Sequence, residues 1–329
     1  MKSLNRLAIS KLIAIAVGII CILFAYNYNQ SATYQISGSI YGTYWKLIST
    51  EYITDALKKE IEEELSRIDY IASNYKKTSE ISRINSAPVN QLINVSQEMY
   101  SLLSFAENLN QVTDGYYDVT LGGLVIENGF GPPDAMTENA LPTSNKRFDF
   151  VSANAIVKND NFQFDLSSIA KGYAVDSIYK IMLQANRNNF LIDIGGEIIV
   201  NGSKHGTPWV IGIQNPLSIN NQSVIEILRT GFLAIATSGE YRNTKLNDSG
   251  QIISHTFIPS TKKSIENKSF SVTVISEKSS MIADAWATAM NVMGPQKGIT
   301  LANQEGIAAM YIMPEENNII KSNFWNYSD

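Results

Sequence analysis

One segment of the chain places a carboxylate, two serines, a lysine and a glycine around the predicted start of a helix. Residues 162–166, rich in aromatic and aliphatic side chains, are predicted to form a short strand that ends on Asp165. Two serines follow in the position of a helix cap, and Lys171 and Gly172 then fall in the first turn of an apolar helix that runs to about Leu183. Backbone N–H groups at a helix start, beside a cation, suit an anion such as a phosphate. An ordinary strand-to-helix turn with a solvent-facing lysine gives the same pattern, so this segment alone leaves both interpretations open.

A second segment, near the C-terminus, sets a carboxylate and a hydroxyl inside an otherwise apolar helix. The pattern predicts this helix over about residues 280–293, capped by Ser279 or Ser280. Asp284 and Thr288 are four residues apart, so they stack on one side of the helix. A buried carboxylate needs a partner, which is either a Lys or Arg from elsewhere or a metal such as Mg²⁺, which accepts hard oxygen ligands. The first segment suits a phosphate and the second suits a metal that binds phosphate. Together they favour a functional site over a purely structural role for these residues.

Composition excludes several kinds of site. The chain has 329 residues, of which 44% are hydrophobic, enough to bury a large core in one domain or in two closely packed ones. It contains only two histidines, His205 and His255, which excludes a His-rich zinc site. Its single cysteine, Cys21, excludes intramolecular disulfides, iron–sulfur clusters and cysteine-based zinc sites. A Rossmann glycine fingerprint and a Walker A loop are both absent from the sequence, so nucleotide binding would need another scaffold.

The N-terminus has the pattern of an export signal. Three cations are followed by residues 12–26, an uncharged and largely apolar run that rises roughly 22 Å as a helix, short of a typical ~30 Å hydrocarbon core. We interpret residues 1–30 as an uncleaved signal or membrane anchor, with the body on the periplasmic face of a bacterial inner membrane. Lipidation at Cys21 is the second interpretation, although Ile20 is not the small residue that lipoprotein signals place before the cysteine.

The body of the chain is acidic. The net charge is −5, and residues 1–26 carry three cations and no acids, so the remainder carries −5 − 3 = −8. This balance argues against nucleic acid as a partner.

The order of predicted elements indicates an α+β fold. A strand pair is expected at 34–40 and 44–49, followed by an amphipathic helix over 55–72 and a second helix over 96–111. From Phe148 onward the chain consists mainly of strands in hairpin-like runs, interrupted by the two helices described above. Hairpins with segregated helices are typical of α+β proteins rather than of a regular βαβ array.

Nine short motifs follow one another in a defined order. They are YGTYW at 41–45, YKKTSEISRIN at 75–85, TDGYYDVT at 113–120, NGFGP at 128–132, DLSSIAKGYAVD at 165–176, IGGE at 194–197, ATSGEYR at 236–242, HTFIP at 255–259 and ADAWAT at 283–288. In this order and at these spacings the chain resembles the ApbE family, the FAD:protein FMN transferases, over about residues 35–312.

The resemblance implies a fold and an activity. It implies an ApbE-like α+β domain over residues 31–329, in which two intimately packed α/β subdomains enclose a cleft for FAD. The implied activity is the Mg²⁺-dependent transfer of FMN from FAD to a Thr or Ser hydroxyl of an acceptor protein, with release of AMP. Acceptors in such systems are extracytoplasmic or membrane redox subunits. The alternatives are a Mg²⁺-dependent FAD pyrophosphatase that yields FMN and AMP, and a catalytically impaired, anchored FAD-binding protein.

The resemblance also assigns roles to individual residues. Those that correspond to contacts with FAD are Tyr41, Tyr75, Tyr116, Tyr117, Asp118, Asp165, Lys171 and Phe257, with Lys171 near the pyrophosphate. Those that correspond to metal ligands are Asp284 and Thr288 through their side chains and Ser168 through its backbone carbonyl. Without the resemblance, Tyr75, Tyr116 and Phe257 are equally well explained as core aromatics.

One motif departs from the family pattern. The family's motif is His-x-x-Asp-Pro-x-Thr-Gly. At the corresponding positions this chain has Ile258 in place of the aspartate and Lys262 in place of the glycine. Isoleucine can neither transfer a proton nor form a hydrogen bond to the ligands of a metal. His255 is left as the candidate base for the acceptor hydroxyl. The departure bears on the rate of turnover and on transfer itself, while phosphate and metal binding are expected to be intact.

Overall fold

The structure is a computed structural model. It describes residues 6–132, 142, 147–216, 223–239, 244–246, 252–254, 256–265, 271–313 and 318–327. His255, the candidate base, lies outside the described residues.

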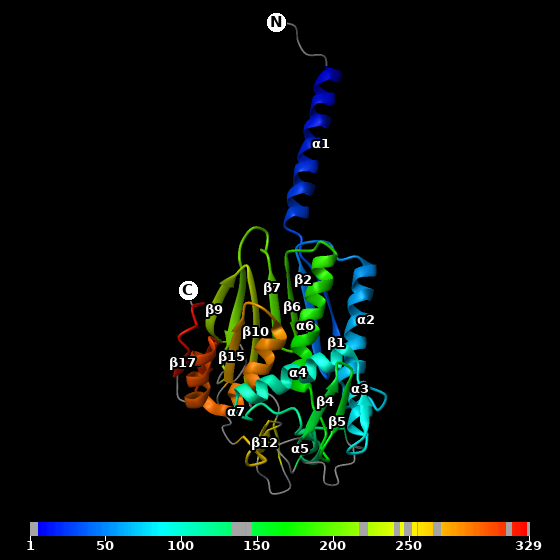
Figure 1. Ribbon diagram of the computed structural model, residues 1–329. Helices are drawn as coiled ribbons and strands as arrows, with labels where there is room; N and C mark the ends of the chain where they lie inside the picture. The colour runs from blue at the N-terminus through cyan, green and yellow to red at the C-terminus, as the bar shows by residue number, and fades with distance from the viewer. Residues whose placement is uncertain are drawn as a thin grey trace.

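An eight-stranded antiparallel sheet forms the centre of the body (Figure 1). Its strands, in spatial order, are β1 (Tyr34–Ile40), β2 (Thr43–Ser49), β6 (Phe190–Ile194), β7 (Glu197–Asn201), β10 (Phe232–Gly239), β15 (Ser271–Ser276), β16 (Ala308–Ile312) and β17 (Ile319–Lys321). The first two strands confirm the expected hairpin. The turn between β6 and β7 consists of Gly195 and Gly196, both with positive φ, and a Cβ on Gly195 would lie 2.8 Å from the Thr43 side chain. The β1–β2 and β6–β7 turns therefore lie against each other at the same end of their strands.

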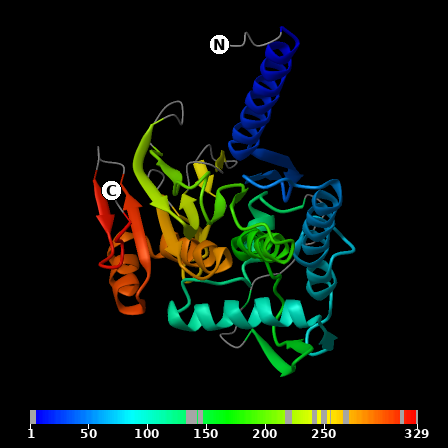
Figure 2. The ribbon, with the colours of Figure 1, turned by 90° about the horizontal axis from the view of Figure 1, so that it is seen from above.

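Helices cover one face of this sheet in two layers (Figure 2). The inner layer holds α2 (Asp55–Ala72), α6 (Ser167–Gln184) and α7 (Ser280–Glu305), and α4 (Gln97–Val112) crosses outside them. The apolar stripe of α2, from Leu57 to Ile68, packs with α6 and with strands β2, β6 and β7. This confirms the amphipathic helix expected over 55–72, and Ser96 caps α4, as a start near residue 96 requires.

A two-stranded hairpin covers the other face of the sheet. It consists of β8 (Trp209–Gln214) and β9 (Val224–Thr230), and it packs with the C-terminal Trp325 against β10, β15 and β16. Trp325 Nε1 donates to Glu226 Oε1 on β9 at 2.7 Å, which ties the end of the chain to the hairpin. Strands β15 and β16 are consequently buried on both faces. The continuous apolar sequence of β16 fits this position, whereas β15 also buries Ser271 and Thr273.

Smaller elements form the part of the body farthest from the N-terminal helix (Figure 1). They are the sheet β3 (Leu92–Asn94), β5 (Ala155–Lys158) and β4 (Phe148–Ser152), the short helices α3 (Glu80–Asn85) and α5 (Gly122–Glu127), and the hairpins β11 (Thr244–Leu246) with β12 (Ile252–Ser254) and β13 (Phe257–Ile258) with β14 (Lys263–Ser264). Antiparallel strands with segregated helices confirm the α+β class.

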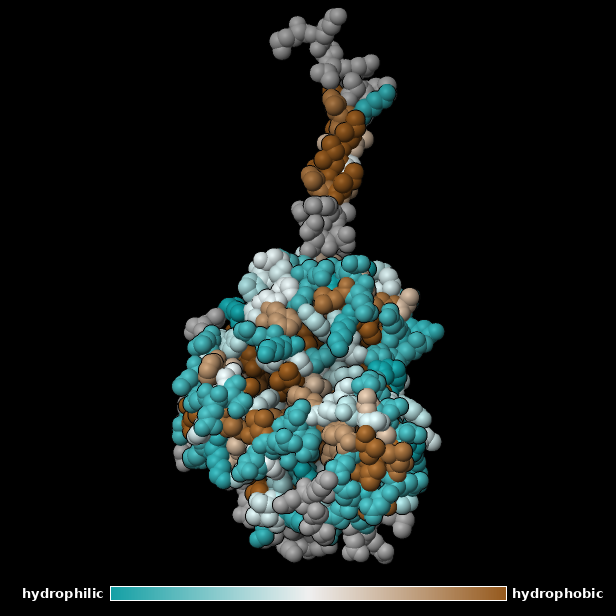
Figure 3. All heavy atoms as spheres, in the orientation of Figure 1, coloured by the Kyte–Doolittle hydropathy of each residue, from teal (hydrophilic) through white to brown (hydrophobic). Residues whose placement is uncertain are grey.

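The N-terminal helix α1 (Arg6–Gln30) projects away from the body (Figure 1). Figure 3 shows its described part as a hydrophobic rod, and the large apolar side chains between Ile9 and Leu23 are exposed. Among the residues that the structure describes, no helix has the length and apolar character needed to cross a membrane.

Three expectations about the start of α6 are wrong. Residues 162–166 are extended but form no strand, because their only ladder contact is a single bridge from Gln163 to Leu121. Leu166, not a serine, is the N-cap residue, and the Asp165 carboxylate accepts a hydrogen bond from Ser167 N at 2.9 Å in its place. Since α6 begins at Ser167, Lys171 lies in the second turn rather than the first.

Candidate functional site

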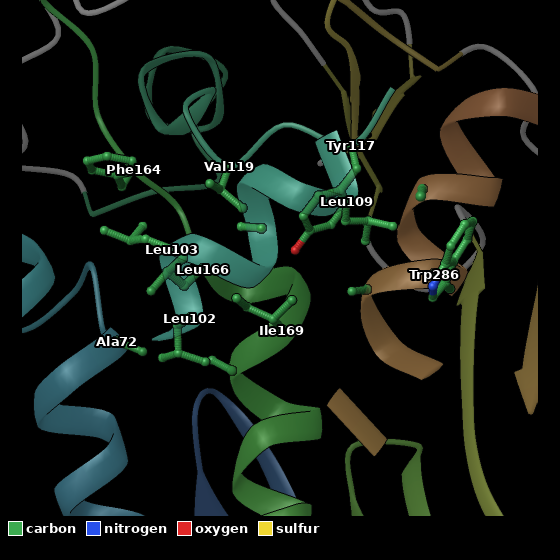
Figure 4. Close-up of a cluster of buried hydrophobic side chains, with 14 of the residues drawn as sticks. Ala72, Leu102, Leu103, Leu109, Tyr117, Val119, Phe164, Leu166, Ile169 and Trp286 are labelled. Atoms are coloured by element: carbon green, nitrogen blue, oxygen red, sulfur yellow. The ribbon is translucent and has the colours of Figure 1, made fainter. Parts of the chain in front are cut away.

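The extended segment before α6 is held by a side chain rather than by a strand. Asn85, the last residue of α3, accepts from Phe164 N at 2.7 Å and donates from its amide to Phe164 O at 3.0 Å. The backbone carbonyl of Asn85 in turn accepts from the buried Lys158 ammonium at 3.1 Å. On the other side, Asp165 N donates to Val119 O at 2.7 Å. Figure 4 shows Phe164 and Val119 in the apolar cluster that covers the start of α6. These contacts fix the position of the Asp165 backbone just before the start of α6.

Close packing joins α6 to the beginning of α7. A Cβ on Gly172 would lie 2.5 Å from Ser280 O, so only glycine permits this approach. One turn later, Asp176 accepts from Ser279 Oγ at 2.5 Å and from Ser280 N at 2.7 Å, which satisfies amides at the start of α7 that have no partner within the helix. Ser279 is itself the N-cap of α7, as expected. The two helices therefore meet in one register, which places Asp284 beside α6.

A cluster of three charged side chains results, drawn from α6, α7 and β7. The Lys171 Nζ lies 3.0 Å from Glu197 Oε1 and 3.8 Å from Asp284 Oδ1. Both carboxylates are buried, and Gly172 N donates to Asp284 Oδ2 at 3.0 Å. Burial raises the pKa of Asp284 to about 8; Lys171 opposes this shift and Glu197 adds to it. The Asp284 carboxylate thus sits in a place where a further cation would be stabilising.

Two further oxygen-bearing groups of the right kind for such a cation belong to the same two helices. Thr288 follows it by one helical turn and is half-buried. In a regular helix the Gly172 amide lies about 2.9 Å from the Ser168 carbonyl, and here the same amide also reaches Asp284. A carboxylate, a hydroxyl and a carbonyl are ligands that Mg²⁺ accepts, with the rest of its shell from water or phosphate. Within the described ranges no group of three or more His, Cys, Asp or Glu side chains could hold a metal.

Tyr117 links this cluster to the start of α6. Its hydroxyl lies 2.8 Å from Ser168 Oγ, and its ring is buried with Trp286 of α7 in the cluster of Figure 4. Burial raises the pKa of Tyr117, and the charges of Asp284 and Asp165 raise it further. The phenol therefore stays protonated and keeps a hydrogen that it can donate beside Ser168.

A second, aromatic group lies around Phe130. Tyr75 is 64% exposed, and its hydroxyl donates to Phe130 O at 2.6 Å. Burial, and after it the Asp165 charge, raise the pKa of Tyr75. Phe257 is buried in an apolar cluster against which Phe130 packs. The predicted residues Tyr75 and Phe257 are thus brought to one region around Phe130, and the exposed Tyr75 ring is accessible to a flat ligand.

Other predicted residues have partners of their own in the structure. The Tyr41 hydroxyl donates to Leu65 O on α2 at 2.8 Å. Tyr116 accepts from Lys297, whose Nζ lies 4.8 Å from the centre of the tyrosine ring. Asp118 forms an ion pair with Arg147 and accepts from Thr120 N at 2.8 Å.

Three residues important for the geometry were missing from the candidates. Asn85 and Asp176 hold backbone groups that are distant in sequence, and nothing in their local pattern reveals those partners. Glu197 had a usable signal: it follows a glycine pair and, with Ile199, occupies alternate positions on the helix-covered face of its strand. A carboxylate at a buried strand position requires a charged partner, and that partner is Lys171.

Known proteins are similar to this chain in sequence and in fold. A model of the ApbE family matches residues 41–311. A FAD:protein FMN transferase of Vibrio cholerae is 35% identical over 296 residues, which covers 86% of this chain and 88% of that protein. The structure of the flavin transferase ApbE from Vibrio cholerae has a TM-score of 0.78 at 32% identity and covers 89% of this chain and 98% of its own. The apo form of the Pseudomonas stutzeri flavinyl transferase ApbE also has a TM-score of 0.78, at 28% identity, covering 90% and 96%.

Proposed function

Because this chain belongs to the ApbE family, we propose that it is a FAD:protein FMN transferase, which moves FMN from FAD to an acceptor protein. The observation that carries the proposal is the cluster of Lys171, Asp284 and Glu197. It brings together a cation suited to phosphate and a buried carboxylate suited to a metal, from two motifs that are far apart in sequence.

In the proposed reaction, the acceptor supplies a Thr or Ser hydroxyl. Its oxygen forms a bond to the phosphorus of the FMN half of FAD, the pyrophosphate P–O bond breaks, and AMP leaves with the bridging oxygen. The hydroxyl proton passes to a base, for which His255 is the proposed group. Lys171 would pair with phosphate oxygens and offset the charge that develops on them. Tyr75 would contribute a stacking surface for a flat ring of FAD.

We further propose Mg²⁺ as the metal, held by Asp284, Thr288 and the carbonyl of Ser168. When bound, Mg²⁺ supplies charge neutralisation and orientation of the phosphate oxygens. Support for this site comes from the raised pKa of Asp284, which indicates that Lys171 does not fully compensate the buried carboxylate. The Thr288 hydroxyl, one helical turn after Asp284, and the Ser168 carbonyl would add two more hard oxygen ligands.

The test is incubation of the purified protein with FAD and a Thr-bearing acceptor, with and without Mg²⁺. We expect AMP in solution and a covalently fluorescent acceptor on a denaturing gel, both only with Mg²⁺. The nucleotides are separated by chromatography. AMP with free FMN and an unlabelled acceptor would show a pyrophosphatase instead. FAD that stays intact through long incubation with Mg²⁺ would overturn the enzymatic proposal and leave an FAD-binding protein.

We propose also that residues 1–30 attach the protein to the periplasmic face of the inner membrane. The exposed apolar side chains of α1 and its projection from the body support this proposal (Figure 3). Cell fractionation of the full chain and of a variant that lacks residues 1–30 tests it. We expect the full chain in the membrane fraction and the shortened chain in the soluble fraction, and equal distribution of the two would rule out the anchor.

A further inference from the structure

Glu197 is the closer of the two carboxylates that share the Lys171 ammonium. The distance from Lys171 Nζ is 3.0 Å to Glu197 Oε1 and 3.8 Å to Asp284 Oδ1. Glu197 belongs to β7, immediately after the Gly195-Gly196 turn, whereas Lys171 belongs to α6. The ion pair therefore ties the helix layer to the sheet at the level of the cluster.

The position of Glu197 leaves the ammonium displaced toward the sheet. Without this carboxylate, the nearest charge to Lys171 in the cluster would be Asp284, and the ammonium would move onto the oxygen atoms that a metal has to use. The charge balance changes in the same sense. With Asp284 ionised, as a metal ligand must be, Glu197 and Asp284 with Lys171 sum to −1, which attracts a divalent cation, whereas Asp284 with Lys171 alone sums to zero.

We propose that Glu197 is a positioning residue that holds the Lys171 ammonium away from Asp284 and so preserves a binding site for a divalent cation. This inference rests on the proposed function, because it takes Asp284 as a metal ligand. Glu197 itself touches neither the cation nor FAD in this scheme. It acts through Lys171, by competing with Asp284 for the ammonium.

The experiment is a calorimetric titration of Mg²⁺ into the FAD-free protein, for wild type, Glu197→Gln, Lys171→Met and the double variant. Glutamine keeps the size of the side chain and removes its charge. We expect Glu197→Gln to weaken Mg²⁺ binding by about tenfold, the lower end of the effect of residues that support metal ligands. Lys171→Met removes the competing cation, so the double variant is expected to recover Mg²⁺ affinity to within about threefold of Lys171→Met alone.

Asp193→Asn is the matched control. Asp193 is a buried acid that accepts from Gly196 N at 3.0 Å in the same turn, but adjacent strand positions place it on the opposite face of the sheet from Glu197. It should perturb the turn without changing the charge of the cluster, and Mg²⁺ affinity should stay within about twofold of wild type.

Two results from the variants would overturn the inference. One is wild-type Mg²⁺ affinity in Glu197→Gln, and the other is a loss that Lys171→Met does not restore, since a purely structural defect would persist in the double variant. A wild-type protein that binds no Mg²⁺ would also overturn it. Failure of the proposed function has a different signature: Mg²⁺ binds and responds to Glu197→Gln as expected, yet FAD yields no labelled acceptor.

Discussion

Replacing Asp284 by asparagine is expected to lower the rate of FMN transfer by about a thousandfold, or ~4 kcal/mol of transition-state stabilisation. The amide keeps the size of the side chain and an oxygen for the Gly172 N–H, but it cannot neutralise a divalent cation. The measurement is the initial rate of acceptor labelling at several Mg²⁺ concentrations. Thr288→Ser, which retains a hydroxyl one turn away, is the matched variant and should keep most of the rate.

The same substitution should leave the metal-free protein at least as stable as wild type. The pKa of Asp284 is raised to about 8 in the folded chain from an ordinary value of 3.8. An acid whose pKa is raised by folding holds more protons in the folded state, so its contribution to stability falls as the pH rises between these two values. At pH 7 asparagine avoids that penalty. Thermal unfolding in EDTA checks this expectation. For the transfer reaction, a rate of the asparagine variant within tenfold of wild type together with normal Mg²⁺ dependence would refute the role of Asp284 as a metal ligand.

Gly172→Ala is expected to destabilise the protein by about 1–3 kcal/mol and to abolish transfer. Alanine normally stabilises a helix interior relative to glycine by about 1 kcal/mol, so the sign is diagnostic. Here the new Cβ would lie 2.5 Å from Ser280 O and 2.7 Å from Met281 N. Both are backbone atoms, so the overlap can be relieved only if α6 and α7 move apart. Separation would also break the hydrogen bond from Gly172 N to Asp284.

Chemical denaturation and the labelling assay together measure this prediction. Gly231→Ala is the matched control, because a Cβ there meets only Gly202 O at 3.6 Å and the residue does not have a positive φ. It should be neutral in both assays. An alanine at position 172 that proved neutral or stabilising would show that the close contact between the helices is not required.

Elements with strong local signals were predictable from the sequence. The amphipathic stripe of α2 and the Ser279 cap of α7 are encoded within single stretches, and both are present in the structure. The pair Asp284 and Thr288 could be identified because polar residues in an apolar helix need a reason to be there. That reasoning located one half of the site before its partners were known.

The remainder depends on contacts between distant segments. Residues 162–166 have strand-like composition, but apart from the single bridge at Gln163 their hydrogen bonds go to the Asn85 side chain and to Val119, so no strand forms. The start of α6 was misplaced because the Asp165 carboxylate, one residue before the N-cap, takes the role expected of a serine. Glu197 meets Lys171 only through the order of strands in the sheet, which a single sequence does not reveal.

Trp286 gives the protein a built-in optical reporter. It lies midway in sequence between Asp284 and Thr288, and it is buried in the apolar cluster of Figure 4. The chain has four tryptophans, and the others, Trp45, Trp209 and Trp325, belong to different clusters around the sheet. Indole emission is quenched by flavins bound nearby, so we expect FAD binding to lower the Trp286 contribution to the emission of the unlabelled protein.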